Sequence, residues 1–354
     1  MPKDITSNEI NKKIPPSATQ PPPFDKGGIT QNDEVLPSPL AGEGELLSEL
    51  RELSNSGEGL KNIKLAKFAG FCYGVKRAVE TAKKLKAENP DKKVFVLGEL
   101  IHNAHVIAQL ETLGIKTLNE IPEKGEGICV IRSHGESPQT IKKIRNAGFE
   151  IVDLTCPDVK KVQQKAIELA KNGYFVVIVG KSEHPEVVAI KANAELWCKN
   201  VVVASSSEQL KDYETKIKNH KHVGVVVQTT QRVTTLNEIV EYLNSVAEEV
   251  RVENTICKST SMRQTEAKEL AKESDLVIVV GSKKSANTTH LAEILRDITK
   301  TIHIENADEL ENHKDLIKKS KDISITAGAS TPQDVIDEVL SSLRGEQSST
   351  SQSH

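Results

Sequence analysis

Short, almost unbroken runs of valine and isoleucine alternate with amphipathic runs through most of the chain. Typical strand-like runs are KVFVLG (93–98), YFVVIVG (174–180) and DLVIVVG (275–281). Runs without polar alternation are typical of parallel strands, whose crossover helices cover both faces of the sheet. Amphipathic runs such as DVKKVQQKAIELAKN (158–172) have the period of those helices. The pattern predicts an α/β fold built from βαβ units with parallel sheets.

The two ends of the chain differ from this core. Residues 1–60 contain PPSATQPPP and LPSPLAGEG and no sustained apolar period, so they are expected to be a disordered N-terminal extension. Only Glu43–Leu53 has the pattern of a short helix there. Residues 344–354 are expected to be a second disordered tail. The core between them divides at its cysteines into three similar α/β domains of common size, namely 61–156, 157–256 and 257–343.

Composition narrows the class of protein. The net charge is −3 and aromatic residues make up only 3% of the chain, so nothing predicts a nucleic-acid or anionic-membrane partner. No apolar run approaches the roughly 20 residues of a membrane span, and no signal peptide is recognisable. We therefore expect a cytoplasmic protein with reduced cysteines. Neither a P-loop nor a dinucleotide-binding glycine motif is present.

Three cysteines share one local setting. Cys72, Cys156 and Cys257 each stand where a strand-like run gives way to a helix-like run, with a basic residue a few positions later. A helix N-terminus and nearby cations favour the thiolate, which binds metal. The separations of 84 and 101 residues (156 − 72 and 257 − 156) are too wide for one zinc finger. Three similar units are therefore expected to bind one central cofactor through these cysteines. Cys129 and Cys198 lack this setting and are not expected to be ligands.

Three thiolates without a fourth fit two kinds of centre. One is a zinc site completed by a histidine, and the other is a [4Fe–4S] cluster with one open iron. Structural zinc usually takes closely spaced ligand pairs such as CxxC, and the chain has none. The spacing therefore favours the cluster.

Polar residues collect where other strand-like runs end, which is where α/β sheets bind ligands. Glu186, just after His184 and a proline, is placed to move protons. Taken singly, each of these residues has a structural explanation, such as capping a helix. Together with helix N-termini they are suited to one small phosphate ester. The set comprises His102, His134, His184, Glu186, Thr229, Ser285, Asn287 and Ser330.

Nine short stretches carry a family resemblance. They are GFCYGVKRAV, IHN, SHG, TCPDVKKV, HPEV, QTTQ, NTICKSTSMRQ, GSKKSAN and AGASTP, in order between about residues 63 and 341. Together they resemble the 4-hydroxy-3-methylbut-2-enyl diphosphate reductases, the IspH/LytB family. The resemblance implies a trefoil of three α/β domains around one [4Fe–4S] cluster. It also implies the last step of the methylerythritol phosphate route, in which an allylic alcohol diphosphate is reduced to isopentenyl and dimethylallyl diphosphates.

The resemblance also assigns roles to residues. Cys72, Cys156 and Cys257 would hold the cluster, whose open iron would take the substrate oxygen. Glu186 would relay a proton to the leaving hydroxyl, Thr229 would act in catalysis and bind the substrate by a hydrogen bond near that hydroxyl, and His184 would act in catalysis and binding. The diphosphate pocket would comprise His102, His134, His184, Ser285, Asn287 and Ser330. A ferredoxin or flavodoxin is the expected electron donor, since no flavin or pyridine nucleotide motif is present.

The core departs from the family pattern in three places, and residues 1–60 match nothing in that pattern. VAIK follows HPEV where many members have Gly-Thr, Ala286 stands where a second serine is expected, and Gln163 replaces a histidine of some relatives. Other functions weighed on the same residues are an open-iron hydro-lyase, a non-enzymatic iron–sulfur redox protein and a zinc-stapled binding module. Only the reductase requires two external electrons in each turnover.

Overall fold

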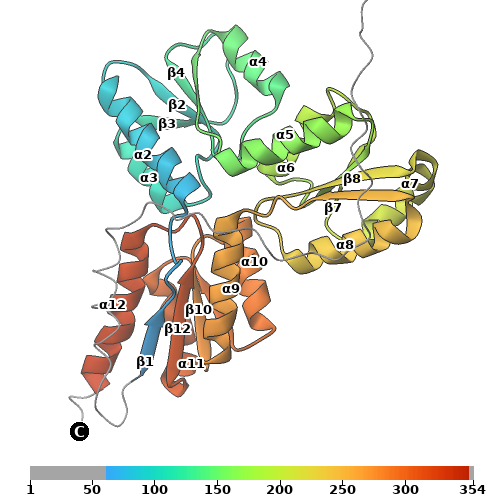
Figure 1. The fold of residues 1–354 in the computed structure, drawn as a ribbon. Coiled ribbons are helices and arrows are strands. Elements are labelled where there is room, and N and C mark those ends of the chain that lie inside the picture. The colour runs from blue at the N-terminus through green and yellow to red at the C-terminus, as the bar shows by residue number, and fades with distance from the viewer. Residues whose placement is uncertain (1–60, 351–354) are drawn as a thin grey trace, which may run out of the picture. The chain divides into compact units, whose positions relative to one another are not determined.

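The computed structural model describes residues 61–350. The expected N-terminal extension, with its candidate helix Glu43–Leu53, lies outside the described residues, as do residues 351–354. The described residues form three four-stranded parallel sheets (Figure 1). The predicted α/β fold with three parallel sheets is therefore confirmed. Within residues 61–350, no helix is both long and apolar enough to cross a membrane.

The first sheet in chain order has the strand order β3-β2-β4-β5. Its strands are β2 (Val94–Leu97), β3 (Ile115–Leu118), β4 (Ile128–Ile131) and β5 (Glu150–Asp153). Its helices are α2 (Tyr73–Glu88), α3 (Ala104–Thr112) and α4 (Pro138–Ala147). The small residues Ala78 and Ala82 let α2 pack closely on Val94 and Val96.

The second sheet has the order β7-β6-β8-β9. Its strands are β6 (Phe175–Val179), β7 (Val201–Ala204), β8 (His222–Val227) and β9 (Glu249–Glu253). Its helices are α5 (Pro157–Lys171), α6 (Pro185–Ala194), η1 (Glu208–Tyr213), α7 (Glu214–His220) and α8 (Val233–Val246). Every residue of β6 is buried, as its continuous apolar run predicts.

The third sheet has the order β1-β12-β10-β11. Its strands are β10 (Leu276–Val280), β11 (Thr301–Ile304), β12 (Asp322–Ala327) and β1 (Asn62–Leu65). Its helices are α9 (Lys258–Lys272), α10 (Ala286–Arg296), η2 (Ala307–His313), α11 (Lys314–Lys319) and α12 (Gln333–Thr350). In Figure 1, α12 lies on one side of this sheet, whereas α9 and α10 lie on the other.

Two expectations about boundaries are corrected. The strand β1 was assigned to the block 61–156, but it pairs with β12 in the third sheet, and in Figure 1 the blue β1 lies beside the red β12. The loose tail expected from residue 344 is helical up to Thr350, because α12 continues to that residue. Its buried residues Val339 and Leu343 hold the preceding turns against the sheet.

One topology is repeated three times. In each sheet the first strand lies between the second and the third, and a fourth strand pairs with the third. The role of fourth strand is taken by β5, β9 and β1. After each fourth strand the chain reaches one of the three cysteines and then a helix that packs on another sheet. The cysteines Cys72, Cys156 and Cys257 thus lie at the crossings between sheets.

Candidate active site

One cavity collects every site residue expected from the sequence. Its internal volume is about 90 Å³, which is small beside the roughly 300–1,000 Å³ usual for small-molecule sites. All three sheets contribute, because the residues stand at strand ends and at the first turns of helices. The predicted residues that line it are Cys72, Cys156, Cys257, His102, His134, His184, Glu186, Thr229, Ser285, Asn287 and Ser330.

The three cysteines are held by the same backbone device. Each is the N-cap residue of its helix, in α2, α5 and α9 respectively. Each cysteine amide also donates a hydrogen bond to a carbonyl two residues after the third strand of a sheet (β12, β4 or β8). The Cys72 amide donates to the Ala329 carbonyl at 3.1 Å, the Cys156 amide to the Ser133 carbonyl at 2.9 Å and the Cys257 amide to the Thr229 carbonyl at 3.0 Å. This repeated hydrogen bond ties the backbone of each cysteine to a polar loop of the cavity.

Gly74 allows two of the thiols to approach one another. A Cβ atom at this position would lie 2.6 Å from the Cys156 Sγ and 4.0 Å from the Cys72 Sγ. Only a residue without a side chain avoids the first contact, because non-bonded carbon atoms do not approach sulfur so closely. The glycine therefore lets the first turn of α2, which follows Cys72, pack directly against the Cys156 thiol.

We expect Gly74→Ala to push Cys156 away from Cys72. Overpacking of this kind costs about 1–3 kcal/mol of stability, and here the strain falls on the thiol itself. Melting temperature and iron content after reconstitution measure the two effects. Gly345→Ala is the matched control, since a Cβ there meets nothing within 4 Å. Unchanged iron binding by Gly74→Ala would contradict the inferred closeness of the two thiols.

The expectation that a helix N-terminus and nearby cations drive the thiols toward thiolate is wrong for two of the three in the free protein. Burial is the largest influence on two of them, raising the pKa of Cys257 to about 11 and also raising the pKa of Cys156. Amide donors at the helix N-termini lower both pKa values but do not outweigh burial. Lys160, four residues after Cys156, instead pairs with Asp153 at 2.7 Å. A bound cation would therefore have to displace thiol protons.

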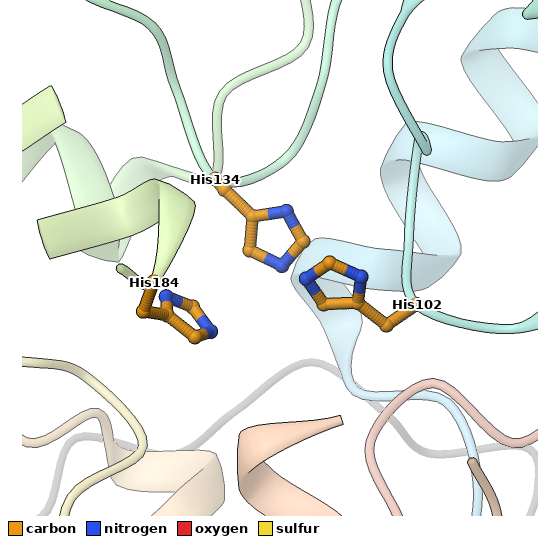
Figure 2. Close-up of side chains that lie close together, drawn as sticks. All are labelled: His102, His134 and His184. Atoms are coloured by element: carbon orange, nitrogen blue, oxygen red, sulfur yellow. The ribbon is translucent and has the colours of Figure 1, made fainter. Parts of the chain in front are cut away.

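Three histidines form a compact cluster (Figure 2). The rings of His102 and His134 stack with centroids 4.6 Å apart, and His184 meets both edge-on at 5.9 and 5.5 Å. Burial, followed by the neighbouring imidazoles, lowers the pKa of His184 to about 3 and that of His134 well below its usual value. At neutral pH the free cavity therefore holds these two rings uncharged.

The hydrogen bonds of the cluster favour an anion over a metal. His184 caps α6, and its Nδ1 accepts the Glu186 amide at 3.2 Å, which leaves the proton of the neutral ring on Nε2. His102 Nδ1 pairs with the Glu99 carboxylate at 2.8 Å, so this nitrogen carries a proton. The three rings offer ligand atoms within 4.8 Å of one another. A proton on Nε2 of His184 nevertheless blocks that atom as a metal ligand and makes it a donor to an anion.

Glu186 is a buried carboxyl group held by one residue. Its side chain is 1% exposed, and Thr229 donates to one oxygen through its amide at 2.7 Å and to the other through Oγ1 at 2.8 Å. Burial raises the pKa of Glu186 to about 7, although both Thr229 bonds lower it. A carboxyl with this pKa is suited to giving and taking a proton near neutral pH.

The hydroxyl and amide residues come from the third sheet. Ser285 is the N-cap of α10, and Asn287 in its first turn has a buried Nδ2 without a hydrogen-bond partner among the described residues. Ser330 follows β12 and donates to the His102 carbonyl at 3.3 Å, which connects two sheets at the cavity. The unpartnered Asn287 amide is a donor available to a ligand.

Several residues of the cavity were not predicted from the sequence. Thr260, three residues after Cys257, has Oγ1 at 3.1 Å from the cysteine Sγ and 3.5 Å from Asn287 Oδ1. Its position at the third residue after an N-cap was the available signal. Asp158 and the exposed Tyr73, each near a cysteine in sequence, also line the cavity. The other two cysteines stand apart, since Cys129 is fully buried in β4 and Cys198 packs beside Tyr174.

The fold and the cavity define an α/β protein whose three sheets share one site lined by three thiols and three imidazoles. A family model described as LytB protein matches residues 63–344, and the chain belongs to this family.

Curated relatives and solved structures agree with this assignment. The 4-hydroxy-3-methylbut-2-enyl diphosphate reductase of Geobacter sulfurreducens is 43% identical over 279 residues, covering 78% of this chain and 95% of that protein. The enzyme of the same name from Clostridioides difficile is 41% identical over 284 residues, covering 80% and 99%.

Two solved structures share the fold. One is (E)-4-hydroxy-3-methyl-but-2-enyl diphosphate reductase, the terminal enzyme of the non-mevalonate pathway, with a TM-score of 0.60 and 37% identity, covering 81% of this chain and 100% of that one. The other is the E-1-hydroxy-2-methyl-but-2-enyl-4-diphosphate reductase of Plasmodium falciparum, with a TM-score of 0.71 and 25% identity over 80% and 87% of the two chains.

Proposed function

We propose that this chain is an oxidoreductase that converts (E)-4-hydroxy-3-methylbut-2-enyl diphosphate to isopentenyl and dimethylallyl diphosphates, the last step of the methylerythritol phosphate route. Membership of the LytB family and the names of its relatives support the reaction. The observation that carries it within the structure is the single cavity shared by three cysteines, three histidines and the buried Glu186. Neither a hydro-lyase nor a redox carrier is favoured by the comparisons.

The cofactor proposed for this site is one [4Fe–4S] cluster with three cysteine ligands and one open iron. Cys72, Cys156 and Cys257 fit it, because they are free thiols delivered to one cavity from three crossings. A fourth thiolate is not at hand, since neither Cys129 nor Cys198 lines the cavity. Such a cluster supplies electrons and a Lewis-acidic iron for the departing oxygen.

The side chains of the cavity would do the remaining work. The Nε2–H of His184, together with His102, His134, Ser285, Asn287 and Ser330, would bind the diphosphate. Loss of the hydroxyl consumes two electrons and two protons, one proton leaving with the oxygen as water and one adding to carbon. Glu186 would deliver the proton to the hydroxyl, and Thr229 would hold the carboxyl in position. Burial of this pair keeps bulk water from competing for that proton.

The external electrons require a partner, for which we propose a ferredoxin or flavodoxin. The sequence has no dinucleotide-binding glycine motif for a flavin or pyridine nucleotide, so a small redox protein is the simplest source. A reducing, cytoplasmic setting belongs to the same proposal, because ligand thiols must stay reduced.

Diphosphate binding is expected to take up protons. The pKa of His184 is about 3 and that of His134 is well below the usual value, so both rings enter the complex uncharged at pH 7. A nearby diphosphate favours the charged rings and raises both pKa values. Affinity should then increase as pH falls through the raised values. Calorimetry in buffers of different ionisation enthalpy counts the protons, and an uptake of zero between pH 6 and about 8 would show binding by neutral rings alone.

The deciding experiment is a metal analysis followed by a reductive assay. Anaerobically purified protein should contain iron and sulfide near four each, and its visible spectrum should change when the allylic diphosphate is added. Consumption of two electrons per substrate then distinguishes the reductase from a hydro-lyase. Zinc without sulfide would overturn the proposal, and so would iron and sulfide without any reduction of the substrate.

A further inference from the structure

A buried arginine outside the cavity holds the segment that leads into Cys72. Arg263 lies in α9, the helix that begins after Cys257, and is 4% exposed. Its Nε donates to the Phe68 carbonyl at 2.9 Å and its Nη2 to the Gly70 carbonyl at 2.6 Å. Gly70 is two residues before Cys72, so a side chain of one cysteine's helix fixes the approach to another cysteine.

A second arginine repeats this arrangement. Arg77 lies in α2, the helix that begins after Cys72. Its Nη2 donates to the Thr155 carbonyl at 2.8 Å and to the Leu154 carbonyl at 3.3 Å. Thr155 immediately precedes Cys156 and is 3% exposed. These carbonyls are therefore held by a charged donor, which forms stronger hydrogen bonds than a neutral one.

A weaker contact of the same kind stands before Cys257. Lys165 lies in α5, the helix that begins after Cys156, and its Nζ is 3.6 Å from the Glu253 carboxylate. Glu253 ends β9, four residues before Cys257. Lys165 also meets Glu168 at 3.2 Å and its side chain is about one third exposed, so this contact is divided and screened by solvent.

The three contacts link the three cysteine segments in a ring. In every case the basic residue belongs to a helix that begins at one cysteine, and its partner precedes the next: 257 to 72, 72 to 156 and 156 to 257. We propose that Arg77 and Arg263 are positioning residues that set the spacing between consecutive ligand cysteines. The proposal deepens the function above, because it rests on the assignment of these cysteines as ligands.

Arg263 has an additional property. Its Nη1, like the Nε of Arg77, is buried and has no hydrogen-bond partner among the described residues, but Arg263 is only 4% exposed, whereas Arg77 is partly buried. The other two guanidinium nitrogens are committed to carbonyls, which fixes the orientation of the group. Of the two arginines, Arg263 is therefore expected to have the larger effect.

The test is cysteine-specific alkylation of the full chain prepared without cofactor. The variants are Arg263→Gln and Arg77→Gln, with Arg145→Gln, an exposed arginine of α4, as matched control. Iodoacetamide labelling is followed by mass spectrometry at each cysteine separately. Arg263→Gln should raise the labelling rate of Cys72 by about five- to tenfold, and Arg77→Gln should do the same for Cys156. The control should change neither rate.

The cysteine that responds decides the outcome. An effect on the next cysteine supports the proposal, whereas an effect on the cysteine of the mutated helix, or an equal effect on all three, overturns it. Circular dichroism before labelling establishes that each variant is folded, and Arg263→Lys, which keeps the charge and one donor, should give a smaller rise at the same site. Unfolded-like labelling in both Arg263 variants would also overturn it. Because no cluster is present, failure of the proposed function would not alter this result.

Discussion

Glu186→Gln is expected to abolish turnover while leaving cofactor and substrate bound. The amide keeps the shape of the side chain: its Oε1 can accept from the Thr229 amide and its Nε2 can donate to Thr229 Oγ1, but it has no acidic proton to give. Removal of a general acid of this kind lowers kcat by about 10²–10⁴-fold. Single-turnover kinetics with a chemical reductant measures the loss, and calorimetry measures binding. A variant that keeps wild-type kcat would refute the proton-relay assignment.

The same substitution should stabilise the fold at high pH. Burial raises the pKa of Glu186 from 4.5 to about 7, so the folded state resists ionisation that the unfolded chain undergoes freely. Ionisation of Glu186 therefore destabilises the folded state increasingly as pH rises from about 4.5 to about 7. Above that pH the loss of folding free energy stays constant, at about 3 kcal/mol at most. Glu186→Gln removes it. The gain in melting temperature over wild type should be larger at pH 8 than at pH 5, and an equal gain at both would contradict the raised pKa.

Cys156→Ser is expected to prevent stable cofactor binding. The thiol lies against Gly74 and is the N-cap of α5, so no other residue can bring a sulfur to its place. Serine is a favourable N-cap residue and is close to cysteine in size, but it is a poor ligand for iron, so iron and sulfide retained after gel filtration should fall about tenfold or more.

Cys198→Ser is the matched control for this loss. Cys198 is also a free thiol near a helix end, but it packs beside Tyr174 and does not line the cavity. The control should keep the wild-type content of iron and sulfide. Full iron and sulfide content in Cys156→Ser, with normal activity, would remove Cys156 from the ligand set and with it the three-cysteine assignment.

The sequence predicted where strands occur better than which strands pair with one another. Strands such as β6 and β10 are continuous apolar runs and were recognisable from composition alone. The strand β3 has no such run, since only Ile115 of its four residues is fully buried. The pairing of β1 with β12 joins residues 260 positions apart, as between Asn62 and Asp322, and leaves no local signal. Periodicity describes a segment's own burial and says nothing of its neighbour.

The candidate site was predictable where a positional rule applied. The rule that ligands bind at the carboxyl ends of strands singled out His102, His134 and Glu186, and all three line the cavity. The state of the thiols was not predictable, because burial of Cys257 outweighs its helix terminus and is not visible in sequence. Arg263 was missed for a related reason. A charged residue in a helix usually faces water, and only tertiary contacts show this one to be buried.

Because the strand order is repeated in all three sheets, only side chains can determine in which orientation a ligand binds. The fifth residue after each first strand is His102, His184 or Ser285, and the third residue after each third strand is His134, Thr230 or Ser330. Backbone alone would present a ligand with three equivalent orientations. At these six positions two sheets supply imidazoles and the third supplies only hydroxyls, so the three repeats are not equivalent, and the proposed diphosphate would favour one of the three orientations. The orientation of the proposed substrate would therefore be set by these few side chains and not by the repeated backbone.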